Sequence, residues 1–112
     1  AQAMTTYEVV TLGRAQRDVD QILTWLRKRS PIGAQRWLLA LEAARAKLAE
    51  GPLRYSRSPE NLRDKMDVRD VFFKTPKGRI YRAIYTVVDN EVRILRIRRP
   101  AQRPLRGRDL PK

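Results

Sequence analysis

Arginines embedded in two apolar, β-branched stretches are the residues of this sequence whose types and spacing could do chemistry. Residues 79–99 read RIYRAIYTVVDNEVRILRIRR and place Arg82, Arg96 and Arg98 among valines and isoleucines. An arginine in the middle of a strand costs packing energy unless its face of the sheet meets something anionic. We therefore predict that one face of a small sheet is left open for phosphate groups or an acidic partner.

Strand alternation indicates which side chains share that face. Arg82 falls on the same face as Ile84 and Thr86, and Arg96 falls on the same face as Arg98. The opposite face, which we expect helices to cover, receives these residues: Tyr81, Ala83, Tyr85, Val87, Leu95 and Ile97. In an alternative interpretation the arginines are edge charges that discourage association between sheets.

Metal-free cleavage of RNA is a reaction that such residues could support. Attack of a 2′-hydroxyl on its neighbouring phosphate needs a proton acceptor, a proton donor and a cation. Arginine stays protonated and supplies only the cation, whereas a lysine can accept a proton where its surroundings lower its pKa. Lys74 and Lys77 are the candidate bases, with plain phosphate contact as the alternative. Tyr81 or Tyr85 could donate a proton unless they face the helices, in which case they belong to the core.

Composition narrows the classes of function. The 112 residues contain 25 Lys plus Arg against 12 Asp plus Glu, and the formal charge of +13 predicts attraction to polyanions. Without cysteine or histidine there can be no disulfide and no thiolate or imidazole metal site, so we expect no metal and no cofactor. We interpret Asp64, Asp67 and Asp70 as ordinary solvated acids. No apolar run approaches the ~18 residues of a membrane span, which predicts a cytoplasmic protein without a membrane partner.

The chemistry-bearing strands must be positioned by the rest of the chain. Residues 7–12 predict a strand, and apolar residues at helical spacing predict a helix that ends near Arg29. Ser30 and Pro31 predict the start of a second helix, and Gly51-Pro52 predicts its end. Strands follow over 67–74 and, after a turn at 75–78, on both sides of a turn at Asp89-Asn90.

The order β-α-α-β-β-β predicts an α+β fold, in which a small, mostly antiparallel four-stranded sheet carries a two-helix hairpin on one face. We expect one domain over residues 7–99. Residues 1–6 form an N-terminal extension, in which Ala1-Gln2-Ala3 ahead of Met4 looks like a remnant of cloning. Residues 100–112 form a basic tail rich in proline and arginine.

The element order and the strand signature together resemble the RelE/ParE superfamily of toxins from type II toxin–antitoxin modules. The signature consists of residues 81–85 (YRAIY) and 92–99 (VRILRIRR), and the resemblance runs from about Tyr7 to Arg99. It implies a cognate antitoxin that wraps an acidic or amphipathic segment around the toxin. RelE-like members cleave mRNA on the ribosome, whereas ParE-like members inhibit DNA gyrase.

The resemblance also assigns roles to residues. Arg82 sits where a strand arginine of RelE-like toxins contacts the scissile phosphate, and Lys74 and Lys77 correspond loosely to the basic residues of that set. We expect nucleic acid or antitoxin to bind these arginines: Arg96, Arg98, Arg99 and Arg103. The tail carries no tyrosine or histidine after Arg99, in contrast to the usual RelE pattern. This departure favours the gyrase interpretation, whereas the charge, the open arginine face and the available lysines make a ribosome-dependent mRNA endoribonuclease our leading prediction. A gyrase inhibitor and a non-toxic RNA-binding module are the alternatives.

Overall fold

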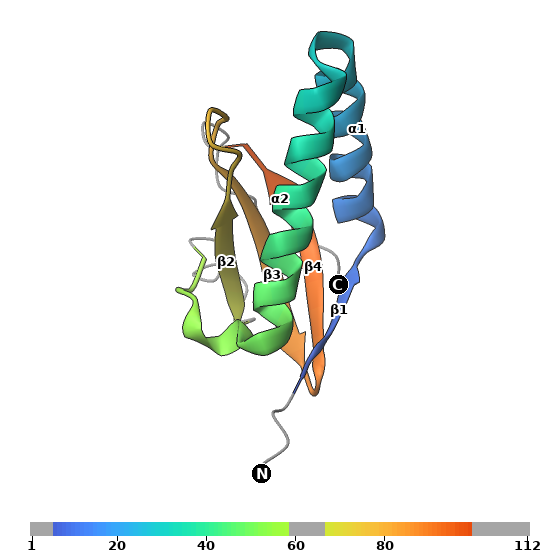
Figure 1. Ribbon diagram of the computed structural model, residues 1–112. Coiled ribbons are helices and arrows are strands. Elements are labelled where there is room, and N and C mark those ends of the chain that lie inside the picture. The colour runs from blue at the N-terminus through green and yellow to red at the C-terminus, as the bar shows by residue number, and fades with distance from the viewer. Residues whose placement is uncertain (1–5, 59–66, 100–112) are drawn as a thin grey trace.

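The computed structural model describes residues 6–58 and 67–99, so that Asp64 and Arg103 lie outside the described residues. Its elements confirm the predicted α+β order (Figure 1). They are β1 (Glu8–Thr11), α1 (Gly13–Arg29), α2 (Pro31–Glu50), the 3₁₀ helix η1 (Pro52–Arg54), β2 (Val68–Phe73), β3 (Tyr81–Val88) and β4 (Glu91–Arg98). The strands form one sheet in the order β1-β4-β3-β2, in which β1 is parallel to β4 and the other neighbours are antiparallel.

The second helix of the hairpin, α2, begins and ends at the residues that its capping signals predict. The Ser30 hydroxyl accepts a hydrogen bond from the Gly33 N–H at 3.0 Å, and Pro31 occupies the first turn of α2. At the other end the Gly51 N–H donates to the Lys47 carbonyl at 3.1 Å. Among the described residues, no helix has the length and apolar character that a membrane crossing requires.

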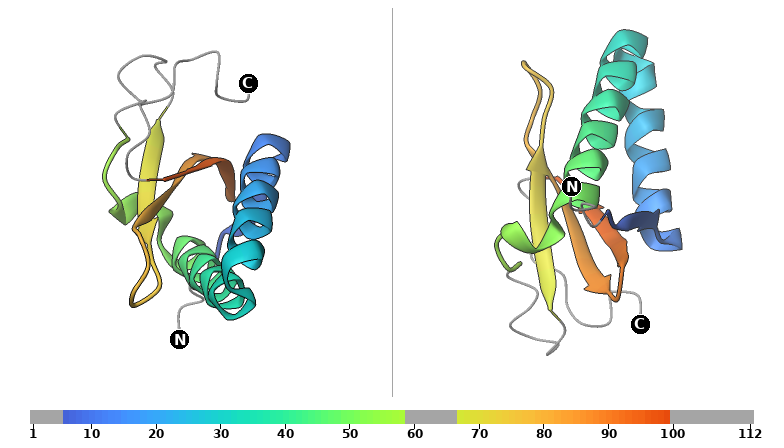
Figure 2. Two further views of the ribbon diagram at one scale, coloured as in Figure 1. Left: turned by 90° about the horizontal axis from the view of Figure 1, so that it is seen from above. Right: turned by 60° about the horizontal axis from the view of Figure 1, so that its bottom comes forward.

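Both helices pack on one side of the sheet (Figure 2), and most of the core lies between these two layers. Trp37 of α2 meets Phe73 and Tyr81 with ring centroids 5.7 and 5.5 Å apart. Burying side chains of this size contributes about 1.5–3 kcal/mol each. The buried residues of this core are Ala15, Val19, Leu23, Ala34, Trp37, Leu41, Ala44, Leu48, Val71, Phe73, Tyr81, Ala83, Tyr85, Val92, Ile94 and Ile97.

The β3–β4 hairpin contains one irregularity that alternation does not predict. Its turn is regular: Asp89 has φ of 55°, in the left-handed region that tight turns require. Within the hairpin, however, Tyr85 pairs with Ile94 and Ile84 with Arg96, so Leu95 is a β-bulge. The bulge turns Leu95 away from the helices. The prediction that Leu95 shares the face of Ile97 is therefore wrong.

Candidate functional site

The face of the sheet away from the helices carries the predicted arginines, but it is less open than the sequence suggested. Arg82 and Arg98 are direct neighbours on β3 and β4. Beside them, Val68, Ile84 and Leu95 form a second apolar cluster, and none of the three is more than 2% exposed. The bulge supplies Leu95 to this cluster. The arginines of this face therefore border buried apolar side chains.

Arg82 forms an internal ion pair. Its Nη1 lies 3.1 Å from a carboxylate oxygen of Asp70 and 3.4 Å from the Ser58 hydroxyl. The two side chains of the ion pair are only 12% and 6% exposed. The expectation that Asp70 is a solvated acid is therefore wrong. Asp70 pairs with Ile84 in the register of β2 and β3, which puts its carboxylate on the face of Arg82 and within its reach.

Arg96 is also held inside the protein, by a residue of α1. Its Nε and Nη2 donate to the two carboxylate oxygens of Asp18 at 2.8 and 3.2 Å. The same carboxylate accepts the Ile97 backbone N–H at 2.9 Å, beyond the point where β1 stops pairing with β4. Asp18 therefore joins α1 to the C-terminal half of β4. The sequence gives no sign of this contact because its partners lie 78 positions apart.

A groove between α1 and β4 gathers most of the remaining candidates. It has a volume of about 250 Å³. The residues lining it are Asp18, Gln21, Ile22, Trp25, Tyr81, Arg96, Ile97, Arg98 and Arg99. We call it the α1–β4 groove. It places Arg98 and Arg99 beside apolar side chains, a combination that suits a partner with both acidic and apolar groups.

Trp25 is the residue of this groove that sequence reasoning did not single out for function. It is 40% exposed, whereas Trp37 is 3% exposed and belongs to the core. The Arg29 guanidinium lies 4.1 Å from the centroid of the Trp25 ring, as in a cation–π contact. An exposed tryptophan beside cations is typical of binding surfaces. Trp25 lies at the edge of the row of apolar residues that repeat at helical spacing along α1, and this position is the sequence feature that could have identified it.

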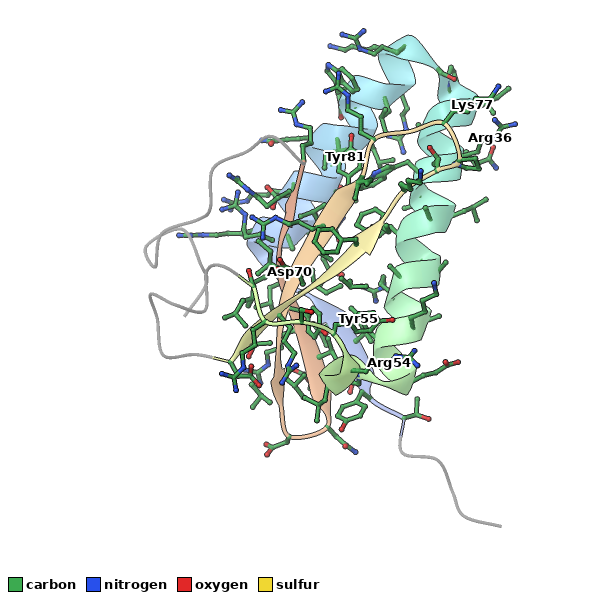
Figure 3. The ribbon with its side chains drawn as sticks, turned by 90° about the vertical axis from the view of Figure 1, so that its left-hand side faces the viewer. Arg36, Arg54, Tyr55, Asp70, Lys77 and Tyr81 are labelled. Atoms are coloured by element: carbon green, nitrogen blue, oxygen red, sulfur yellow. The ribbon has the colours of Figure 1, made fainter. Side chains whose placement is uncertain are left out.

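The candidate bases do not lie in the α1–β4 groove. Lys74 follows the end of β2 and lines a different groove, against Ala43 and Lys47 of α2. Lys77 lies at the tip of the turn between β2 and β3, well away from Asp70, as Figure 3 shows. The structure thus makes Arg82 and Arg98 neighbours in the sheet, and it brings Arg96, Arg98 and Arg99 together in the α1–β4 groove. Neither lysine lines that groove.

The two candidate tyrosine donors belong to the core, as the sequence predicted for residues that face the helices. Tyr85 is fully buried, and its hydroxyl donates to the Pro52 carbonyl at 2.5 Å. Burial raises the pKa of Tyr85 far above its ordinary value, with a smaller opposing effect from the Arg69 charge. Tyr81 is 5% exposed, although its side chain also borders the α1–β4 groove.

Comparison with known proteins identifies a family. Residues 9–104 match the family described as "ParE toxin of type II toxin-antitoxin system, parDE". A solved structure, the toxin–antitoxin complex RelBE2 from Mycobacterium tuberculosis, contains a similar chain at 24% sequence identity and a TM-score of 0.49. That alignment covers 85% of the present chain and 99% of the other. No curated protein sequence matches this one.

Proposed function

The chain belongs to the ParE toxin family of type II toxin–antitoxin systems, and on this premise we propose that it arrests growth by inhibiting DNA gyrase. In this proposal the α1–β4 groove contacts the target protein, and no bond is made or broken by the toxin. The family match over residues 9–104 is the observation that carries the proposal.

The surroundings of Arg82 support gyrase inhibition over mRNA cleavage. In a nuclease this guanidinium would face the scissile phosphate and stabilise its developing charge. Here Asp70 lies 3.1 Å from Arg82, and both side chains are nearly buried. The neighbouring carboxylate offsets the positive charge and would repel a phosphate. A substrate would have to break this ion pair before it gained the contact.

The positions of Lys74 and Lys77 also support gyrase inhibition over mRNA cleavage. A general base must lie within hydrogen-bonding reach of the proton that it removes, directly or through one water. Lys74 lines a groove formed with α2, and Lys77 lies at the tip of a turn. Neither lysine therefore lines the α1–β4 groove with Arg98, whose register partner in the sheet is Arg82.

Ribosome-dependent mRNA cleavage remains the second candidate because of one feature of the α1–β4 groove. Arg98 and Arg99 line it together with Trp25 and Tyr81. Cations next to aromatic rings are the usual means of binding unpaired RNA bases and their phosphates. This candidate needs Arg82 to exchange Asp70 for a phosphate on the ribosome.

The proposal includes a cognate antitoxin as partner. The family description places its members in two-component modules, and a free toxin must be neutralised in a growing cell. The formal charge of +13 favours an antitoxin with acidic segments and predicts that the complex weakens as salt concentration rises.

Pulse-labelling after induction in bacteria tests the target. We expect thymidine incorporation to fall before methionine incorporation, because loss of gyrase activity stops replication first. An early fall in methionine incorporation would overturn the proposal in favour of mRNA cleavage, and primer extension on cellular mRNA would then map the cuts.

A supercoiling assay with purified gyrase tests the groove. Trp25→Ala should weaken inhibition, since Trp25 lines the groove and is 40% exposed. Leu39→Ala is the matched control, because Leu39 is an exposed apolar residue of α2, at 64% exposure, that does not line the groove. Equal inhibition by the two variants would contradict a role for the groove.

A further inference from the structure

Among the described residues, the outer edge of β2 forms backbone hydrogen bonds along its first half only. The Ser58 N–H donates to the Val68 carbonyl at 2.8 Å, and the Asp70 N–H donates to the Ser56 carbonyl at 3.1 Å. These bonds show that even-numbered residues of β2 direct their N–H and C=O groups outward. Phe72 has the same orientation, and no other described segment hydrogen-bonds its backbone from the outer side.

Large apolar side chains are exposed at the half of this edge that no described segment pairs with. Phe72 is 62% exposed, and Ile80, just before β3, is 48% exposed. Beside them lies a groove of about 380 Å³, lined by Ala40, Ala43, Ala44, Lys47, Phe72, Phe73, Lys74 and Ile80. We call it the β2-edge groove. An open strand edge next to exposed apolar groups invites pairing with another chain unless a partner covers it.

The charges around the β2-edge groove indicate which charge its partner should carry. Lys47 and Lys74 are the charged residues that line it, and both are cations. A second copy of this chain would bring its own lysines against these two and would add another charge of +13. Like charges at such close range oppose association. An acidic partner would instead gain ion pairs at the rim of the groove.

We propose that the β2-edge groove docks a short extended segment of a partner protein, apolar at its centre and acidic at its ends. The backbone of the segment would pair with the N–H and C=O of Phe72 and so extend the sheet by one strand. Its central side chains would cover Phe72 and enter the groove, and its acidic side chains would meet Lys47 and Lys74. The inference rests on the proposed function in one respect, namely that the cognate antitoxin carries the segment.

Hydrogen exchange on the complex of the full chain with its antitoxin is the deciding measurement. If the segment pairs with β2, exchange of the Phe72 amide slows by about tenfold or more on binding, because a new hydrogen bond must open first. The Phe72 amide exchanging at the same rate in the free and bound toxin would overturn the proposal.

Photo-cross-linking gives the location independently. A benzophenone amino acid in place of Phe72 should cross-link to the antitoxin. The same probe in place of Trp25, in the α1–β4 groove, is the matched control because that side chain is also well exposed. A cross-link from position 25 without one from position 72 would assign the partner to the other groove and refute the inference.

Charge reversal tests the acidic character of the segment. Lys47→Glu should weaken antitoxin binding by about tenfold or more, through lost attraction and new repulsion. Lys47→Arg should bind nearly as well as the parent protein. Lys28→Glu, which reverses an exposed lysine of α1, is the control. Equal losses from the two Glu variants would indicate a general effect of net charge and contradict a specific contact.

Two further results separate this inference from the proposed function. Arrest of DNA synthesis is measured without the antitoxin, so a toxin that arrests growth but leaves Phe72 unprotected refutes only the docking site. A docked antitoxin on a chain that arrests nothing refutes only the function. A dimer of the isolated chain that Phe72→Glu dissociates would assign the edge to a second copy and overturn the proposal.

Discussion

The two sides of β3 differ in the interactions that stabilise their buried side chains. Tyr81, Ala83 and Tyr85 face the helices and are buried among apolar residues. On the other side, Arg82 is almost as well buried, but its charge is balanced by Asp70. The stability of the first side comes from close packing and buried apolar area, whereas that of the second side depends on the carboxylate of Asp70. The comparison shows that an arginine pattern in a strand need not mark a free charge.

The largest change in the free energy of unfolding should come from removing a core side chain on the helix-covered side of the sheet. Trp37→Ala removes a ring that is 3% exposed and that packs against Phe73 and Tyr81. Loss of such a side chain from a core lowers the free energy of unfolding by about 3–5 kcal/mol. Urea denaturation measures the loss, and Trp25→Ala is the control with a much smaller expected effect. A loss below that of Trp25→Ala would contradict the assignment of Trp37 to the core.

The next largest change should come from the ion pair on the other side. Asp70→Ala leaves the Arg82 guanidinium nearly buried without its carboxylate, which should lower the free energy of unfolding by about 3 kcal/mol. The double variant Asp70→Ala/Arg82→Met should recover much of that loss, because it removes both charges. If the single variant unfolds at the same urea concentration as the parent protein, Asp70 does not balance Arg82.

Removing the buried hydroxyl of Tyr85 should have an intermediate effect on the free energy of unfolding, and this effect should depend on pH. Tyr85→Phe leaves the Pro52 carbonyl without its donor and should reduce the free energy of unfolding by about 1–3 kcal/mol. The raised pKa of Tyr85 also means that the unfolded chain releases this proton more readily than the folded one. The contribution of Tyr85 is therefore complete below about pH 10 and declines as the pH rises further. Thermal unfolding between neutral and alkaline pH should show a smaller decline for Tyr85→Phe.

The smallest change should come from an exposed arginine on the same side as Arg82. Arg93 pairs with Glu91 at 2.6 Å, but its side chain is 43% exposed. Solvent screening limits such a pair, so Arg93→Ala should alter the free energy of unfolding by less than about 1 kcal/mol. A loss as large as that of Asp70→Ala would show that burial does not distinguish the two arginines.

Much of the fold could be predicted from local signals. Ser30, Pro31 and Gly51 mark the helix ends because caps depend on a few adjacent residues. Residues that alternate along β3 assign the two faces of that strand correctly. Alternation failed at Leu95, since a bulge depends on how two strands pair and leaves no clear local pattern.

The candidate site was less predictable than the fold. The sequence drew attention to Arg82 and Arg96, and both lie in the strands that were expected, while their functional roles stay predictions. Their partners could not be foreseen, because Asp70 and Asp18 approach them only after the strands and α1 have packed. Lys74 and Lys77 looked close to these arginines along the chain, yet a strand edge and a turn direct them elsewhere.

The sequence by itself determined the order of the elements, the helix-facing side of β3 and the strong positive charge. These properties follow from periodicity, caps and composition, which are all local or additive. Only the tertiary structure decided which arginines are balanced by carboxylates, which tryptophan stays exposed and which half of the β2 edge the described residues leave unpaired. Those outcomes depend on contacts between residues far apart in the chain, and such contacts exist only once the two layers have come together.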